Sequence, residues 1–443
     1  MHPGPEGVGS VSLSVSGRAR LRRASRAHSA AYAGLILFTV LLYARPNDLL
    51  PIGTFPIVKI MTIGTLAVFF VERLLQGGPL SGMPRPFKYL LALAGLTILS
   101  IPFALDPSNS FTAFTDVFLK TLLVFLLTIN VVTSFQRLRV IMEVTVLSGA
   151  FVAVISLSDF LQGKNLVEEY RATGAVGGIF GNPNDLALAL NVLLPLAIGL
   201  ALSRPSPFTK LLYGGCAALL AVTSVVTYSR AGFITMVVAG VFLLVKVARR
   251  SPVAWAVGAL AAAAIVVSSP GRVFTLFEGS SGTLSAAESA TARWELVKRS
   301  IVVAGANPVR WMFGVGIDNF GIVSHHDQAN HNAFLQVFNE VGLPAMICYC
   351  LFLFSVFRIM GVMSKRYRKA RGHRQVWLTV ITIQTSLVAY AVGSIFASVA
   401  FLWYVYYPAA FAVCLQQLLA HAERRPAQRE VTPRVWYLRR VQH

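Results

Sequence analysis

Long apolar stretches separated by short polar connections recur along most of the 443-residue chain. Most of them are close to 20 residues long, the length that an α-helix needs to cross the hydrocarbon core of a membrane. Lipid offers no hydrogen-bond partners to the backbone, so these segments are predicted to be helices. The predicted spans are 30–45, 55–74, 87–105, 111–133, 139–162, 184–203, 209–228, 231–248, 252–268, 331–361, 375–394 and 397–420.

Composition agrees with an all-α polytopic membrane protein of about twelve transmembrane helices. Mean hydropathy is +0.65, and only 13% of the residues are charged, against about 25% in soluble domains. Membrane β-barrels have alternating segments of about ten residues, which this sequence lacks.

The pattern of spans and polar stretches predicts five parts. The long polar stretch includes Ser285 to Ala304, which has the pattern of an amphipathic helix. The parts are a basic, disordered cytoplasmic tail (1–29), spans one to nine (30–268), a large periplasmic loop subdomain (269–330), spans ten to twelve (331–420) and a second basic cytoplasmic tail (421–443).

The net charge of +21 raises the question of nucleic-acid binding. With the N-terminus inside, however, most of the 39 lysines and arginines fall in the two tails and the inner connections, as the positive-inside rule requires. The charge therefore indicates a multi-pass protein with both termini cytoplasmic, attracted to anionic membrane lipids and not to nucleic acid.

Two arginines on the predicted outer side are candidates for binding a phosphorylated substrate. Arg230 lies in Tyr-Ser-Arg-Ala-Gly between two spans, and Arg293 lies in the large loop. A guanidinium binds phosphate through paired hydrogen bonds, so the two could hold a pyrophosphate and neutralise charge that develops as it leaves. The alternatives are a contact with lipid headgroups for Arg230 and a solvated helix face for Arg293.

His331 is the candidate for handling a proton. Imidazole is the side-chain group most often used for proton transfer, so His331 could accept or position the proton of a hydroxyl group. The alternative is an interfacial cap or an ordinary hydrogen-bonded histidine. Glu340 falls on the opposite face of the helix predicted to start at His331-Asn332, so we expect it to make a structural pair and no dyad with His331.

Other polar residues are weaker candidates for substrate binding. Asn184 or Asp185 could cap the helix that follows Gly-Asn-Pro-Asn-Asp, or Asn184 could contact a sugar. The further substrate-binding candidates, most of them cations with a solvated alternative, are Asn332, Arg272, Lys298 and Arg299.

The sequence predicts no metal site and no cofactor. It has no Asp-x-Asp pair, P-loop, Gly-x-Ser-x-Gly or His-Glu-x-x-His. Nucleotide-sugar, ATP-driven and metalloprotease chemistry therefore have no support.

A set of motifs in the second half of the chain resembles the O-antigen ligase/polymerase family of bacterial membrane glycosyltransferases. Each motif alone is short, but together they follow the order of the family. They are Gly-Ile-Phe-Gly-Asn-Pro-Asn-Asp-Leu-Ala (178–187), Tyr-Ser-Arg-Ala-Gly (228–232), the Arg293–Trp294 segment, Gly-Val-Gly-Ile-Asp-Asn-Phe (314–320) and His-Asn-Ala-Phe-Leu-Gln with Glu-Val-Gly-Leu (331–343).

The resemblance implies a fold like that of C-type glycosyltransferases and an inner-membrane enzyme with its active site facing the periplasm. Such an enzyme takes a glycan from undecaprenyl pyrophosphate and passes it to lipid A-core, to a second lipid-linked glycan or to protein. Arg230 and Arg293 would bind the pyrophosphate, and His331 would activate or position the acceptor hydroxyl. A ligase is the leading interpretation, and a polymerase is the alternative.

Two other classes remain open. A transporter of lipid-linked oligosaccharides would show paired repeats and broken helices around a central cavity, whereas this chain gathers its polar residues in one large loop. A scaffold of a polysaccharide export complex would have no need of His331.

Overall fold

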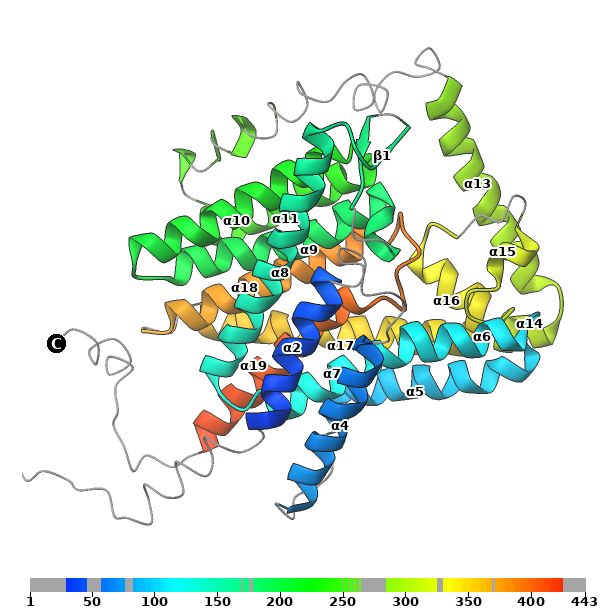
Figure 1. Cartoon of the computed structure of the whole chain (residues 1–443), viewed down its shortest axis with the longest axis horizontal. Coiled ribbons are helices and arrows are strands. Elements are labelled where there is room, and N and C mark those ends of the chain that lie inside the picture. The colour runs from blue at the N-terminus through cyan, green and yellow to red at the C-terminus, as the bar shows by residue number, and fades with distance from the viewer. Residues whose placement is uncertain are drawn as a thin grey trace, which may run out of the picture.

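The structure is a computed structural model, and it is helical over most of its described length (Figure 1). It describes residues 29–45, 57–75, 83–168, 170–174, 178–249, 284–324, 330–368, 370 and 372–424, together with several residues between 251 and 263. Within these ranges one antiparallel pair of two-residue strands, β1 (Leu166–Val167) and β2 (Arg171–Ala172), forms the only sheet. The predicted tails lie outside the described residues except for residues 29 and 421–424.

The first half of the chain is a series of helices joined by short turns. A π-helical turn, η2 (Phe114–Phe118), joins α6 to α7, and a 3-10 turn, η1 (Ile101–Phe103), extends α5. The helices are α2 (Ser29–Ala44), α4 (Ile57–Leu75), α5 (Arg85–Ser100), α6 (Pro107–Ala113), α7 (Leu119–Val131) and α8 (Phe135–Leu161).

The second half continues the helical series. The predicted amphipathic helix 285–304 is confirmed as α13. The elements are η3 (Gly178–Gly181), α9 (Pro183–Ser203), α10 (Pro207–Val226), α11 (Arg230–Val247), α13 (Leu284–Gly305), α14 (Pro308–Phe313), α15 (Phe320–Val323), α16 (Ala333–Val341), α17 (Leu343–Tyr367), α18 (Arg374–Gly393), η6 (Trp403–Val405) and α19 (Tyr406–Arg424).

Eight helical segments among the described residues are long and apolar enough to cross a membrane, and α2 contributes a shorter apolar helix. The prediction of an all-α polytopic membrane protein is thereby confirmed. Most of the predicted span 252–268 lies outside the described residues, so the number of about twelve spans stays a prediction. The eight are Arg85–Phe103, Pro107–Val131, Phe135–Leu161, Pro183–Ser203, Pro207–Val226, Arg230–Val247, Leu343–Tyr367 and Arg374–Gly393.

Helix α9 is the most enclosed of these segments and packs against α8, α10, α11 and α18. Small residues allow the close approach, as they do between membrane helices in general. A Cβ added to Gly232 of α11 would lie 2.6 Å from the Cβ of Ala187, and one added to Gly199 would lie 2.4 Å from Cγ2 of Thr382. The Gly232–Ala187 contact lies beside the turn between α10 and α11, where Arg230 lies.

A buried asparagine of α9, Asn191, forms hydrogen bonds to both α10 and α11. Asn191 Nδ2 donates to the carbonyl of Gly232 at 2.7 Å, and its Oδ1 accepts from Ser224 Oγ at 3.1 Å. Asn191 is almost fully buried, and burial of an amide is tolerated only with such partners. The last turn of α10 and the first turn of α11 are therefore both bonded to the middle of α9.

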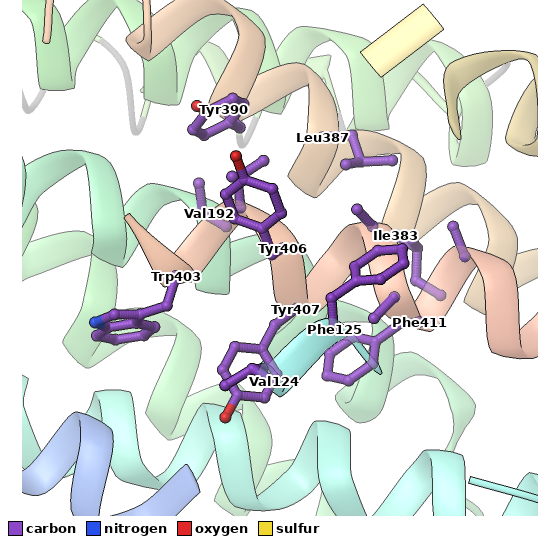
Figure 2. Packing of buried hydrophobic residues seen from close by; sticks show 14 of the residues in the cluster. Val124, Phe125, Val192, Ile383, Leu387, Tyr390, Trp403, Tyr406, Tyr407 and Phe411 are labelled. Carbon is purple, nitrogen blue, oxygen red and sulfur yellow. The ribbon is translucent and has the colours of Figure 1, made fainter. Parts of the chain in front are cut away.

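Buried aromatic residues of α18, η6 and α19 pack together within the hydrophobic core (Figure 2). Tyr390, Tyr406 and Tyr407 are all fully buried. Tyr406 OH donates to the carbonyl of Ala400, and Thr121 Oγ1 donates to that of Phe401. These bonds satisfy two carbonyl groups of the non-helical connection 394–402, and such backbone is tolerated within a membrane only where protein surrounds it.

The prediction of one continuous helix over 331–361 is wrong. Helix α16 ends at Val341 and α17 begins at Leu343, because Gly342 adopts φ +97° and ψ 174°, a region open only to glycine. A Cβ there would lie 2.2 Å from the carbonyl oxygen of Met312. The apolar pattern runs through the break, and Pro344 sits in the first turn of α17, where proline is tolerated.

We expect Gly342→Ala to lower the free energy of unfolding by about 3 kcal/mol or more. Backbone strain of about 1–3 kcal/mol adds to the clash with Met312. Gly361→Ala is the matched control, because a Cβ there meets nothing within 4 Å, and it should be neutral or stabilise α17 by up to about 1 kcal/mol. Thermal unfolding in detergent, followed by tryptophan fluorescence, checks both, and equal melting temperatures for the two variants would contradict the prediction.

Candidate functional site

The Tyr-Ser-Arg-Ala-Gly motif forms the sharp turn between α10 and α11. Tyr228 takes a left-handed conformation with φ +47°, which is uncommon for a bulky residue. Ser229 is the N-cap of α11, and its Oγ accepts from Gly232 N at 3.1 Å. Arg230 is therefore the first residue of α11, half-buried at a helix N-terminus, where the helix dipole favours an anion and not a second cation.

The Gly-Asn-Pro-Asn-Asp segment lies against this turn. The N-cap of α9 is Asn182, whose Oδ1 accepts from Asn184 N at 2.8 Å. Neither Asn184 nor Asp185, the two predicted caps, has that role. The helix starts earlier because Pro183 supplies a preset φ at its first position. Instead, Asn184 Oδ1 accepts from Ser229 Oγ at 2.8 Å, so the motifs 178–187 and 228–232 meet.

Arg171 completes the junction, and the sequence analysis gave it no role. Its side chain is mostly buried and donates from Nη2 to Asn184 Oδ1 at 3.0 Å and from Nε to the carbonyl of Thr227 at 3.1 Å. A third bond, from Nη1, reaches Glu168 Oε1 at 3.2 Å. One signal in the sequence was its place on the predicted outer side, where an arginine needs a reason. Arg171 fixes both sides of the turn that carries Arg230.

We expect Arg171→Leu to lower the free energy of unfolding by about 1–3 kcal/mol, because Asn184 and the Thr227 carbonyl lose a charged donor. Lys164→Leu is the matched control, since Lys164 is exposed and its Nζ donates to Gln162 Oε1, two residues away. Thermal unfolding of the two purified variants checks this. A smaller loss for Arg171→Leu than for Lys164→Leu would contradict it.

The motifs 314–320 and 331–343 form a second group, and they contact each other through backbone and carboxylate hydrogen bonds. Val315 N donates to the carbonyl of Asn339 at 2.7 Å, and Gly316 N donates to that of Glu340 at 2.9 Å. Glu340 Oε2 accepts from Asp318 N at 3.1 Å. The glycine turn 314–320 is therefore bonded to the last turn of α16, and the expected structural role of Glu340 is confirmed.

Burial raises the pKa of the Glu340 carboxyl from its ordinary value of 4.5 to about 8, and the charge of Asp318 acts in the same direction. Between these values the folded chain holds a proton that the unfolded chain has released. Folding therefore takes up a proton, and the free energy of unfolding falls as pH rises from about 5 to 8. Burial also raises the pKa of Asp318.

We expect Glu340→Gln to flatten this pH dependence, by on the order of 1 kcal/mol per pH unit. The amide oxygen of glutamine still accepts from Asp318 N, so the turn is kept. Melting temperatures of wild type and variant between pH 5 and 8 test this, and parallel curves would refute it. Gln336→Glu is no control here, because Gln336 Nε2 itself bonds Glu340 at 3.4 Å.

His331 lies immediately before α16 in a strained conformation. Its φ is +48°, and strain of this kind gathers at functional sites. Asn332 is the N-cap, and its Oδ1 accepts from Phe334 N at 2.9 Å and Leu335 N at 3.0 Å. The predicted helix start at His331-Asn332 is confirmed, and the cap occupies the side-chain oxygen of Asn332.

The connection 394–402 lies between the two groups of motifs. The first group is 178–187 with 228–232, and the second is 314–320 with 331–343. Ala333 N donates to the carbonyl of Ser394 at 2.8 Å, and Ala400 N donates to Gln336 Oε1 at 3.2 Å. At its other side the ring of Trp403 packs on Phe180 of the first group, with centroids 6.1 Å apart. In Figure 1 the chain after α18 runs between α9 and α16. The described contacts thus connect the Arg230 turn to the start of α16.

Residues 215–350 match the family model described as O-Antigen ligase. This segment is similar to the O-antigen ligase/polymerase family. This confirms the resemblance, because the matched segment holds the Arg230 turn, the glycine turn and His331. No curated protein matches the chain.

Within the matched segment, four cations were predicted to meet the substrate besides Arg230. Lys298 is exposed and pairs with Glu295 at 2.8 Å, and Arg299 Nε donates to the carbonyl of Val323 at 3.0 Å. Arg293 lies in α13, but its side chain is outside the described part, as is the whole of Arg272. The substrate roles of these four residues stay predictions.

No cluster of three or more histidine, cysteine, aspartate or glutamate side chains among the described residues could hold a metal ion. Two acidic side chains near the candidate site have other partners: Glu340 accepts from Asp318 N, and Glu168 pairs with Arg171.

Proposed function

We propose that this chain is a metal-independent membrane glycosyltransferase of the O-antigen ligase type. It transfers a glycan from undecaprenyl pyrophosphate to lipid A-core on the periplasmic side of the bacterial inner membrane, in lipopolysaccharide or surface polysaccharide biosynthesis. The observation that carries the proposal is the junction of Asn184, Ser229 and Arg171, which holds Arg230 at the N-terminus of α11. The family match over residues 215–350 supports the same class of substrate.

Arg230 and the first turn of α11 supply what a leaving pyrophosphate requires. The N-terminus of a helix presents unpaired amide groups and positive potential to an anion. A guanidinium at that position adds paired hydrogen bonds and a charge that no physiological pH removes. As the bond from the anomeric carbon to the pyrophosphate oxygen breaks, this site neutralises the charge that grows on the leaving group. Arg293 is proposed to bind the same pyrophosphate.

His331 handles the acceptor in this proposal. The acceptor hydroxyl oxygen attacks the anomeric carbon, its proton passes to the imidazole, and undecaprenyl pyrophosphate leaves with the bonding electrons. In-line displacement inverts the configuration at the anomeric carbon. The strained backbone at His331 and the fixed start of α16, capped by Asn332 and bonded to Ser394, support a positioned side chain.

The proposed topology places both termini in the cytoplasm and residues 269–330 in a periplasmic loop. It rests on the distribution of lysine and arginine. Arg272, Lys298 and Arg299 in this loop are proposed to attract the anionic substrate, and Asn184 and Asn332 are proposed to line the site.

Transfer by purified protein from a radiolabelled undecaprenyl-pyrophosphate glycan tests the proposal. The reaction contains EDTA and either lipid A-core or a second lipid-linked repeat as acceptor. Labelled lipid A-core is the expected product, and elongated lipid-linked glycan would instead identify a polymerase of the same family. If neither forms while the glycan crosses proteoliposomes that contain the protein, the chain is a transporter and the enzymatic roles fall.

A further inference from the structure

An open pocket of about 450 Å³ lies where the end of α9 meets the first turn of α18. Gln375 Nε2 of α18 donates to the carbonyl of Ser203 at 3.4 Å and holds the two ends together. The Asn182 cap and Asn184 occupy the opposite end of the same 21-residue helix. At a rise of 1.5 Å per residue, the pocket lies about 30 Å from the candidate site. It is therefore a separate feature of the molecule.

Three cations line the pocket, and two of them lack acidic partners. Arg204 forms an ion pair with Glu143 and lies over the ring of Tyr213, 5.5 Å from its centroid. Lys210 and Arg374 are exposed, and no aspartate or glutamate in the described part of the chain pairs with either. The pocket thus presents two positive charges from two different helices toward one space.

Large apolar side chains stand exposed beside these cations. Leu202, Phe208 and Leu211 are exposed by 49%, 74% and 76%, and each lies near the end of a membrane-spanning helix. Cations next to exposed apolar surface mark the depth at which lipid headgroups meet acyl chains. A free anion matches only the charged half of this pattern.

We propose that this pocket is a binding site for an anionic phospholipid. Lys210 and Arg374 bind the headgroup phosphate, and Leu202 and Phe208 contact the acyl chains. Inorganic phosphate shares the headgroup chemistry but has no apolar part, so it binds weakly. The proposal does not depend on glycosyl transfer, because none of its residues belongs to the candidate site. It predicts that a specific lipid holds the ends of α9, α10 and α18 together.

Native mass spectrometry of the full chain in detergent, titrated with phosphatidylglycerol, tests this site. We expect one molecule to bind at least tenfold more tightly than phosphatidylethanolamine. The double variant Lys210→Gln/Arg374→Gln should lose about tenfold in that affinity, since each cation near an anionic headgroup contributes measurably. The matched control is Arg85→Gln/Lys88→Gln, which removes two exposed cations from the start of α5.

Size-exclusion chromatography and the melting temperature without lipid show whether each double variant folds. Equal losses of affinity in both double variants would overturn the proposal, because they would indicate attraction by overall charge. Equal binding of phosphatidylglycerol and phosphatidylethanolamine would also overturn it. A third contrary result is a rise in melting temperature with millimolar inorganic phosphate alone that equals the rise with phosphatidylglycerol. That result would identify a site for the free anion.

Discussion

Arg230→Ala should lower the rate of glycan transfer by about 100-fold to 1,000-fold, the usual effect of removing one group that stabilises developing charge. The loss should fall mainly on kcat, because the charge on the pyrophosphate grows as its bond to the sugar breaks. Arg230→Lys should recover only part of the rate, since lysine keeps the charge but lacks the planar fork of donors. Steady-state kinetics with a labelled lipid-linked donor measure these effects.

Lys246→Ala is the matched control for Arg230→Ala. Lys246 lies in the last turn of the same helix, exposed and stacked over Phe242, so the change removes one cation from α11 at the end away from the site. Its transfer rate should equal that of the wild type. If the two alanine variants lose activity equally, the effect comes from the charge or folding of α11, and Arg230 has no special place in the reaction.

His331→Asn should lower transfer by about 100-fold to 10,000-fold, the range of a lost general base. Asparagine is the substitution to make because it tolerates the left-handed backbone found at φ +48°. The variant should therefore melt at the wild-type temperature.

A second variant separates the chemistry of His331 from its backbone. His331→Val cannot easily adopt the positive φ and should melt at a lower temperature, whereas His331→Asn should not. Wild-type transfer by His331→Asn would contradict the proposed role and leave His331 as an ordinary residue before the Asn332 cap.

The sequence predicted the elements that depend on local patterns. Apolar runs of near-span length marked the membrane helices, and His331-Asn332 marked the start of α16, because capping involves only neighbouring residues. The Arg230 turn was placed correctly between two spans. The family resemblance also came from short ordered motifs, and the match over residues 215–350 covers four of the five completely.

Features decided by distant contacts were missed. At the break, Gly342 lies against the backbone of Met312, thirty positions earlier in the chain. The apolar pattern continues through the break and does not reveal this contact. Asn182, Asn184 and Asp185 could each cap α9 by their residue type. Asn182 is the cap, and Asn184 instead bonds to Arg171 and Ser229. No local pattern records these bonds. The place of Arg171 on the predicted outer side indicates that it has a role, but its partners cannot be read from the sequence for the same reason.

The first half of the chain also contributes more than membrane spans. Asn109 Nδ2 donates to Asn319 Oδ1 at 2.8 Å, and Asn319 Nδ2 donates to the carbonyl of Asp106 at 2.9 Å. The glycine turn is therefore hydrogen-bonded to the start of α6, more than 200 residues earlier in the chain. A pattern of apolar and polar positions cannot predict a contact between two short polar turns so far apart in sequence.

Release of undecaprenyl pyrophosphate tests the central claim most directly. Purified wild-type protein receives a lipid-linked glycan donor in EDTA, and the freed carrier and the transferred glycan are both counted after acceptor is added. We expect one undecaprenyl pyrophosphate for each glycan transferred, a product of inverted anomeric configuration, and formation of both products slowed by about 100-fold or more with Arg230→Ala. Transfer without release of the carrier pyrophosphate, or full release and transfer by Arg230→Ala, would contradict it.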